Sequence, residues 1–258
     1  MQLTWFGTAG FKIEHKNQTL LIDPYVTRNP KAFPNQALKP SDIQTAHQIL
    51  ITHGHFDHIL DVPEIASKTN ATVYCGRGVD RTLIQNGLKT SQIKRVKTYG
   101  QTFHLGDLTI QAFFSSHIRF DRWLAIKTLC RIHFNLARYL PLLRNYPEGR
   151  VLSWRISTKE KTLHHFGSGG AELSELKKLS QQPIDILLVP MQGHTQITRI
   201  ALNHVTCLKP KMVIPHHQDN FFPPISTQVD TQPFVEQVNR SQPDTTVLVM
   251  KINETIEI

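Results

Sequence analysis

Cysteine is scarce in this chain, and the few cysteines that occur are far apart. The 258 residues include only Cys75, Cys130 and Cys207, with no CxxC pair among them. An odd number of widely spaced cysteines argues against a disulfide framework and is typical of a reducing compartment. The chain also lacks a run of about 20 apolar residues, which a membrane-spanning helix needs. Because its first residues lack the basic segment and apolar run of a signal peptide, we expect a cytoplasmic protein.

Acidic residues are outnumbered by basic ones. The chain has 29 Lys and Arg against 20 Asp and Glu, a net charge of +9. Much of the excess lies between residues 119 and 150, which hold seven basic residues and two acidic ones. A basic region favours anionic partners such as phosphate-bearing substrates, membrane surfaces or nucleic acid, without choosing among them.

The hydrophobic pattern predicts one domain, residues 1–258, built from two β-rich halves. In each half, strands that follow one another directly give way to alternating strands and helices, which indicates two packed sheets with helices outside. Residues 26–40, rich in Pro, Asn and Lys, are expected to form a long loop. Strands are predicted at 3–6, 11–14, 19–22, 47–52, 72–75, 94–98, 102–105, 108–114, 151–157, 163–166, 184–190, 212–215 and 246–250, and helices at 60–68, 81–86, 171–180, 195–208 and 231–240.

Residues 119–147 interrupt this order. Apolar residues recur there at roughly helical spacing with Arg and Lys between them, and Pro141 and Pro147 are expected to limit the segment. The pattern predicts a basic amphipathic helical insertion on one rim. The insertion either covers an acyl chain or contacts a membrane surface as a peripheral element, or it is an ordinary helix packed on the body. The apolar positions are Phe120, Trp123, Leu124, Ile126, Leu129, Cys130, Phe134, Ala137 and Leu140.

A dense group of metal-ligand residue types follows the apolar stretch Ile49-Leu50-Ile51. The run His53-Gly54-His55-Phe56-Asp57-His58 holds three imidazoles and a carboxylate within six residues. On an extended chain, side chains two residues apart point the same way, so His53 and His55 can reach one common point. Asp57 and His58 follow where the chain should turn into a helix, and they can face a second point nearby. These ligand types are preferred by zinc and related divalent ions, so the run predicts two adjacent metal sites.

The run resembles the HxHxDH signature of the metallo-β-lactamase superfamily. Further segments are similar to the branch that contains ascorbate-6-phosphate lactonase-like proteins and, more distantly, N-acyl-phosphatidylethanolamine phospholipase D. The similarity extends from Met1 to about Pro224 and implies a four-layer αββα sandwich with hydrolase activity. Its other segments are Trp5-Phe6-Gly7-Thr8-Ala9-Gly10, Leu21-Ile22-Asp23-Pro24, Ser115-Ser116-His117 and Lys209-Pro210-Lys211-Met212-Val213-Ile214-Pro215.

The resemblance implies a ligand set for each metal. The first ion would be held by His53, His55 and His117, and the second by Asp57, His58 and His217. Two assignments have rivals: His117 as a surface-loop histidine, and His216 in place of His217. Asp23 is expected to orient a ligand histidine and not to bind the metal itself.

One position departs from the resemblance. Many relatives carry a Gly-Asp pair whose aspartate bridges the two metals, whereas this chain has Ser168 in the run His165-Phe166-Gly167-Ser168-Gly169-Gly170. A hydroxyl is a poorer ligand than a carboxylate, so the second site is expected to be weaker. We expect two ions when metal is ample and one when it is scarce. Zinc is the first choice because imidazoles dominate the set, with manganese and iron as alternatives.

These features predict metal-dependent hydrolysis through a metal-bound hydroxide, with Asp57 as proton acceptor. His194 either faces the substrate and protonates the leaving group, or is a loop histidine. Arg119, Arg122 and Trp123 follow His117 closely and are expected to contact the substrate. The expected substrate is a small anionic molecule: a phosphodiester, a phospholipid-like compound or a lactone.

Two other functions remain open. A nuclease acting on RNA or DNA could use the same metals and the positive surface to hold a phosphate backbone. The chain shows no appended RNA-binding module and no basic, aromatic-rich strand, which disfavours nucleic acid. A non-catalytic metal-binding protein is the other alternative, with Ser168 as a sign of decay. The complete set of six ligands disfavours that interpretation.

Overall fold

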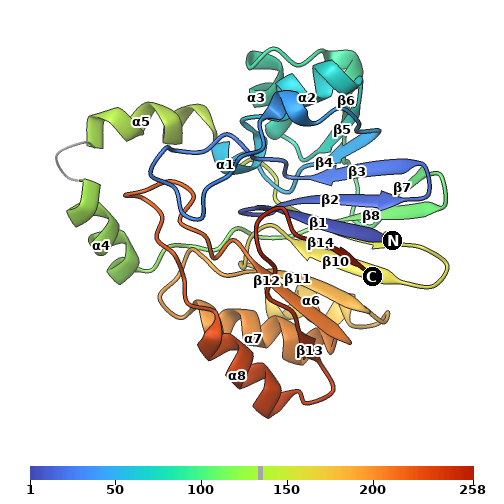
Figure 1. Cartoon of the computed structure of the whole chain (residues 1–258), viewed down its shortest axis with the longest axis vertical. Helices are drawn as coiled ribbons and strands as arrows, with labels where there is room; N and C mark the ends of the chain where they lie inside the picture. Colours follow the sequence, from blue (N-terminus) through green and yellow to red (C-terminus); the bar gives the residue numbers. More distant parts are fainter. Residues whose placement is uncertain (133–135) are drawn as a thin grey trace.

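The computed structural model, which describes residues 1–132 and 136–258, contains two seven-stranded sheets (Figure 1). The first sheet has the strand order β14-β1-β2-β3-β4-β5-β6, and the second has the order β13-β12-β11-β10-β9-β8-β7. The strands are β1 Gln2–Gly7, β2 Gly10–His15, β3 Gln18–Ile22, β4 Gln48–Leu50, β5 Thr72–Cys75, β6 Ile93–Arg95, β7 Gln101–Leu105, β8 Leu108–Phe114, β9 Leu152–Ser157, β10 Thr162–Phe166, β11 Ile186–Pro190, β12 Met212–His216, β13 Thr246–Val247 and β14 Thr255–Glu257.

Both sheets combine an antiparallel meander with parallel strands. In the first sheet, β1, β2 and β3 are antiparallel, and β3 to β6 run parallel. In the second, β7 to β10 are antiparallel, and β10 to β13 run parallel. Parallel neighbours need crossover connections. Helices supply them here except between β3 and β4, where a long loop with the 3₁₀ turn η1 makes the crossover. The predicted change from successive strands to strand–helix alternation is therefore present in each half.

Four layers follow from where the apolar side chains lie. A central core between the sheets joins residues of both, including Phe11, Leu20 and Trp154. Outside the first sheet, α2 and α3 cover a second apolar cluster, and α6, α7 and α8 cover a third on the second sheet. This arrangement confirms the predicted αββα sandwich. The helices are α1 Phe56–Ile59, α2 Val62–Thr69, α3 Val79–Gln85, α4 Arg122–Ile132, α5 Leu136–Asn145, α6 Leu173–Leu179, α7 Ile197–Leu208 and α8 Gln232–Ser241, with short 3₁₀ turns η1 Pro40–Asp42 and η2 Thr90–Gln92.

Four predicted elements differ from the structure. The strand predicted at 94–98 is shortened to β6, which ends at Arg95. The last predicted strand, 246–250, is shortened to β13, and a strand that was not predicted, β14, pairs with β1 and closes the first sheet. The predicted helix 60–68 is preceded by a separate turn of helix, α1. Pro141 does not end the insertion helix, because it lies inside α5. Proline in a helix interior removes one backbone donor and is usually disfavoured, which explains the wrong boundary.

The predicted insertion is helical, as α4 and α5. Residues 133–135, and with them the predicted apolar position Phe134, lie outside the described residues. Both helices lie beyond one end of the sheets, on the side where α1 is found (Figure 1). In the described part of the chain, none of the helices has the length and apolar character needed to cross a bilayer.

Candidate metal centre

The predicted ligands come from three loops and one short helix at the same end of the two sheets. His53 and His55 follow β4, and α1 carries Asp57 and His58. His117 lies three residues beyond β8, and His217 directly follows β12. The chain ends of strands from both sheets thus bring side chains together that are up to 164 residues apart in sequence.

These six side chains form two triads. The first consists of His53, His55 and His117, and the second of Asp57, His58 and His217. Within each triad, the potential ligand atoms lie within 4.8 Å of one another. In the first, His53 Nε2 is 3.1 Å from His55 Nδ1. In the second, Asp57 Oδ2 is 3.2 Å from His217 Nε2 and 3.7 Å from His58 Nε2.

Hydrogen bonds at Nδ1 orient three of the ligand rings. His58 Nδ1 donates to Asp23 Oδ2 at 2.7 Å, and His117 Nδ1 donates to the Ile118 carbonyl at 2.6 Å. His53 Nδ1 lies 3.0 Å from the Thr52 hydroxyl, which itself donates to Asp23. The Thr52 hydroxyl must therefore accept a hydrogen bond from His53 Nδ1–H. In their neutral forms, these three rings carry the proton on Nδ1 and leave Nε2 to serve as the ligand atom, as metal-ligating histidines do.

The electrostatics of the first triad favour neutral imidazole. Burial and the neighbouring histidines hold the pKa of His53 well below its usual value. Burial, and then the nearby His55, lower the pKa of His117 to about 4. Neutral rings cannot repel a cation and keep their lone pairs available, so this triad suits a divalent ion.

The second triad is more negative. Burial opposes the ionisation of Asp57, but His58 and a hydrogen bond from His217 outweigh it, so the pKa of Asp57 lies below its usual value. Burial lowers the pKa of His58, but the carboxylates of Asp23 and Asp57 raise it overall. The carboxylates of Asp23 and Asp57 therefore stabilise positive charge at this triad. Without a metal that charge is the proton on His58, and a bound metal cation could take its place.

His217 and His216 have opposite surroundings. His217 has a left-handed backbone, with φ of 61°, and its buried Nδ1 has no hydrogen-bond partner among the described residues. His216 points into the sheets, where its Nε2 bonds to the Phe166 carbonyl and its ring stacks on His165. His216 Nδ1 also lacks a hydrogen-bond partner, so the left-handed backbone of His217 and its place in the second triad distinguish the two residues. A strained backbone is typical of functional positions. The geometry therefore favours His217 over His216.

The triads open into a cavity of about 300 Å³ with a largely apolar wall. The wall residues Leu142 and Tyr146 come from the insertion, and Phe56 and Phe221 form an aromatic cluster with Tyr25. Such a mixture of apolar walls with a few polar groups is typical of small-molecule sites. The remaining lining residues include Ile118, Phe120, Gly167, Ser168, Pro190, Gln192, Gly193 and Ile225.

The predicted substrate residues are less close to the triads. His194 and Arg119 line a second, larger cavity and do not line the one with the triads. Arg122 and Trp123 lie on the exposed side of α4, with the guanidinium 5.7 Å from the indole centroid. Ser168 lies in the wall of the triad cavity, and its hydroxyl accepts a hydrogen bond from Ile118 N–H at 2.9 Å. Of the predicted substrate contacts, the structure brings none into the triad cavity.

Other functional positions had no sequence signal. The sequence does not identify Thr52 as a site residue, because a single threonine at a strand end is common. In the structure, its hydroxyl links Asp23 to two ligand histidines. Arg28 and Asp219 form a buried ion pair that anchors the loop after β12, next to His217. Asp219 also accepts from Thr8 N–H at 2.9 Å. Only the tertiary structure reveals these links, because their partners are remote in sequence.

Known proteins show the same architecture. The profile of the family described as "Beta-lactamase superfamily domain" matches residues 2–217. A UPF0173 metal-dependent hydrolase of Carboxydothermus hydrogenoformans is 31% identical over 232 residues, covering 89% of each chain. A second UPF0173 metal-dependent hydrolase, of Staphylococcus aureus strain JH9, is 28% identical and covers 100% of both.

A solved structure agrees at the level of the fold. Igni18, a metallo hydrolase from Ignicoccus hospitalis, superimposes with a TM-score of 0.71 at 24% identity, covering 99% of this chain and 97% of the other. The two triads, the αββα layers and the matched profile lead to one conclusion: this chain belongs to the metallo-β-lactamase superfamily and is a metal-dependent hydrolase.

Proposed function

We propose that the chain hydrolyses a small anionic organic molecule at the two triads, with a phosphodiester, a phospholipid-like compound or a lactone as substrate. The observation that carries this proposal is the position of both triads on a cavity of about 300 Å³ with apolar walls. A cavity of this size takes one reacting group and a short apolar portion. It is too small to enclose a folded polymer.

Two divalent ions, zinc in the first instance and manganese or iron as alternatives, fit the six side chains. When bound, such a pair supplies Lewis-acid activation of water and of the scissile bond. The second site is proposed to be the weaker one, because Ser168 offers a neutral hydroxyl that already accepts the Ile118 N–H. Metal analysis after reconstitution should find two ions per chain at excess metal, and a chain without any transition ion would contradict the proposal.

The protein's own groups orient the reaction. Asp57 is ionised, lies between His58 and His217, and can accept a hydrogen bond and a proton from the attacking water. Asp23 and Thr52 fix the ring orientations behind the triads. The side chains of Leu142, Tyr146 and Phe221 keep bulk water away from the reacting group. His194 is not placed for direct protonation of a leaving group held in this cavity.

Substitution of one ligand from each triad tests the proposal. We expect His55→Ala and Asp57→Ala each to lower turnover of bis(p-nitrophenyl) phosphate or of a simple lactone at least about a hundredfold. His15→Ala, which changes a histidine outside both triads, is the control and should keep full activity. Activity that survives both ligand substitutions would place the reaction elsewhere.

The same assay separates the alternatives. A nuclease would cleave RNA or DNA in preference to the small substrates, and its binding would weaken steeply as salt is raised. A non-catalytic metal-binding protein would retain two ions and turn over none of these compounds.

A further inference from the structure

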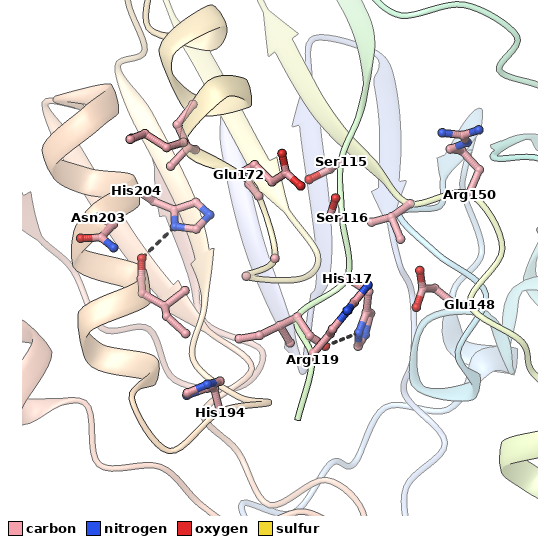
Figure 2. A pocket seen from close by; sticks show the side chains of 18 of the residues that line it. Ser115, Ser116, His117, Arg119, Glu148, Arg150, Glu172, His194, Asn203 and His204 are labelled. Carbon is pink, nitrogen blue, oxygen red and sulfur yellow. Dashed lines mark hydrogen bonds between the residues drawn. The ribbon is translucent and has the colours of Figure 1, made fainter. Parts of the chain in front are cut away.

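A larger cavity of about 1330 Å³ lies next to the triad cavity, and the two share His117 and Ile118 in their walls (Figure 2). The segment after β8, which carries Ser115, Ser116 and His117, lines this cavity between α7 on one side and Arg150 on the other. We call it the arginine cleft, after Arg77, Arg81, Arg119 and Arg150 in its lining. A ligand that reaches the first triad at His117 can therefore extend into it.

The charge of the arginine cleft is positive and largely unneutralised. Its four arginines face two carboxylates, Glu148 and Glu172. In the described part of the chain, the guanidinium groups of Arg77, Arg81 and Arg119 make no hydrogen bond or ion pair with protein. Exposed arginines usually lie apart on a surface, whereas these surround one hollow. Their free donors are available to an anion.

Backbone contacts fix this wall to the metal loop. Arg150 N–H donates to the Arg77 carbonyl at 2.8 Å, and a Cβ on Gly76 would stand 2.1 Å from the Arg150 carbonyl oxygen. On the other side, Gly54 N–H, between His53 and His55, donates to the Glu148 carbonyl at 2.8 Å. A Cβ on Gly54 would lie 2.2 Å from the Pro147 oxygen. Close backbone packing thus joins the arginine wall directly to two ligand histidines.

Arg150 is also held by its side chain. Its guanidinium lies 4.9 Å from the ring centroid of Phe114, the last residue of β8. A stacked guanidinium keeps its edge donors available for a second partner. The cleft therefore has one arginine oriented by an aromatic ring, Arg150, and three whose guanidinium groups have no protein partner.

We propose that the arginine cleft binds the anionic group of the substrate, specifically a phosphate ester, while the scissile bond lies beside His117 at the triads. Guanidinium groups bind phosphate through paired, charge-assisted hydrogen bonds, which explains why arginines and not lysines line the cleft. The apolar triad cavity then receives the uncharged part, so the substrate is an amphiphilic phosphate compound. This inference rests on the proposed hydrolysis and specifies where the charged group of the substrate binds.

A polynucleotide is disfavoured by the same wall. Glu148 and Glu172 stand among the arginines and would repel the successive phosphates of a nucleic-acid backbone, whereas one phosphate group can be placed away from them.

Phosphate binding to the metal-loaded protein tests this inference. We expect the double variant Arg77→Gln/Arg81→Gln to bind inorganic phosphate at least about tenfold more weakly than the unaltered chain in calorimetric titrations. Arg240→Gln, which removes the same charge from the exposed end of α8, is the matched control and should bind phosphate normally. Equal affinity in the double variant would overturn the inference, because phosphate would then bind at the metals alone. Tighter binding of a short single-stranded RNA than of phosphate would also overturn it.

Kinetics separate this inference from the proposed hydrolysis. In the double variant, KM for a p-nitrophenyl ester whose acyl chain ends in a phosphate group should rise about tenfold with kcat within about twofold, because this phosphate is separate from the bond that is cleaved. Neutral p-nitrophenyl acetate should be unaffected. An equal loss of kcat/KM with both substrates would overturn the role of the cleft without contradicting the proposed hydrolysis. Weaker phosphate binding in a protein that hydrolyses neither ester would instead support the cleft and contradict the proposed hydrolysis.

Discussion

Asp23 is the residue on which the geometry of the second triad depends. Its carboxylate accepts from Thr52 N–H at 2.8 Å, from the Thr52 hydroxyl and from His58 Nδ1 at 2.7 Å. It is fully buried and has a left-handed backbone, with φ of 42°. Such a conformation is costly outside glycine, so the three hydrogen bonds must compensate for it. The resemblance predicted that Asp23 orients a histidine, and the contact with His58 is of that kind.

Asp23→Asn should therefore weaken metal binding. An amide oxygen keeps the volume but cannot accept all three donors, and its NH₂ group would oppose the His58 and Thr52 donors. Loss of an oriented carboxylate behind a ligand histidine costs about 10–100-fold in metal affinity. Competition with a chelator measures this affinity, with circular dichroism to show that the chain stays folded.

Asp61→Asn provides the matched control. Asp61 is also buried, but its carboxylate accepts from Val26 N–H and Thr27 N–H, away from the ligand rings. This change should lower stability while leaving metal affinity unchanged. Equal losses of affinity in both variants would mean that Asp23 acts only on general stability.

At the scale of elements, α4 has two different faces. Thr128 and Ile132 are buried against the body, whereas Trp123 and Ile126 are 60% and 49% exposed. Arg122 shares the exposed face with this apolar pair. The sequence left two interpretations open, a packed helix or a membrane contact. The buried face shows that the helix packs on the body. The exposed face leaves membrane contact as a prediction.

We expect α4 to bind vesicles that contain anionic lipid, because exposed aromatic and aliphatic side chains beside cations suit an anionic bilayer surface. The double variant Trp123→Ala/Ile126→Ala should co-sediment less with phosphatidylserine vesicles than the unaltered chain does. The unaltered chain should also co-sediment less with vesicles of neutral phosphatidylcholine alone. Leu173→Ala changes a side chain of comparable exposure, 56%, on α6 and should bind normally. Binding that is unchanged in the α4 double variant would contradict the prediction.

The strand that the sequence did not predict, β14, was missed for a physical reason. β14 is short and mostly exposed, with the sequence Thr255-Ile256-Glu257, and only its pairing with β1 makes it a strand. Local propensity carries little information about such an edge. The buried strands β11 and β12 were placed within about two residues because their apolar runs reflect burial on both faces.

Across the whole molecule, the fold and the centre of the site were accessible from sequence, and the surroundings of the site were not. The spacing of His53 and His55, followed by Asp57 and His58, predicts two metal sites because local geometry turns each pair toward its own point. The metal-ligand roles of His117 and His217 were predicted from the family resemblance, since no short-range sequence pattern connects these residues to the histidine cluster. The arginine cleft had only a partial signal. The basic segment 119–150 contains Arg119 and Arg150, whereas Arg77 meets Arg150 only through a backbone hydrogen bond between remote loops.

Glu175 affects the stability of the whole fold through pH. Burial on α6, with some repulsion from Glu172, raises the pKa of its carboxyl to about 7 from a usual value of 4.5. The folded chain therefore holds a proton between about pH 4.5 and 7 that the unfolded chain has released. When the unfolded state binds fewer protons, stability falls as pH rises. The contribution is fully present below pH 4.5 and is lost as the pH reaches about 7.

Glu175→Gln should remove this dependence, because the neutral amide resembles the protonated carboxyl that the folded chain prefers. At pH 8 the variant should be more stable than the unaltered chain by on the order of 2 kcal/mol, allowing for partial exposure, and at pH 4.5 the two should be equal. Urea unfolding of the metal-loaded protein at both pH values measures the difference. Glu64→Gln, at an exposed position of α2, should show no such pH-dependent gain. A Glu175 variant that is less stable at pH 8 would mean that the ionised carboxylate is stabilised in the folded chain, contrary to the burial argument.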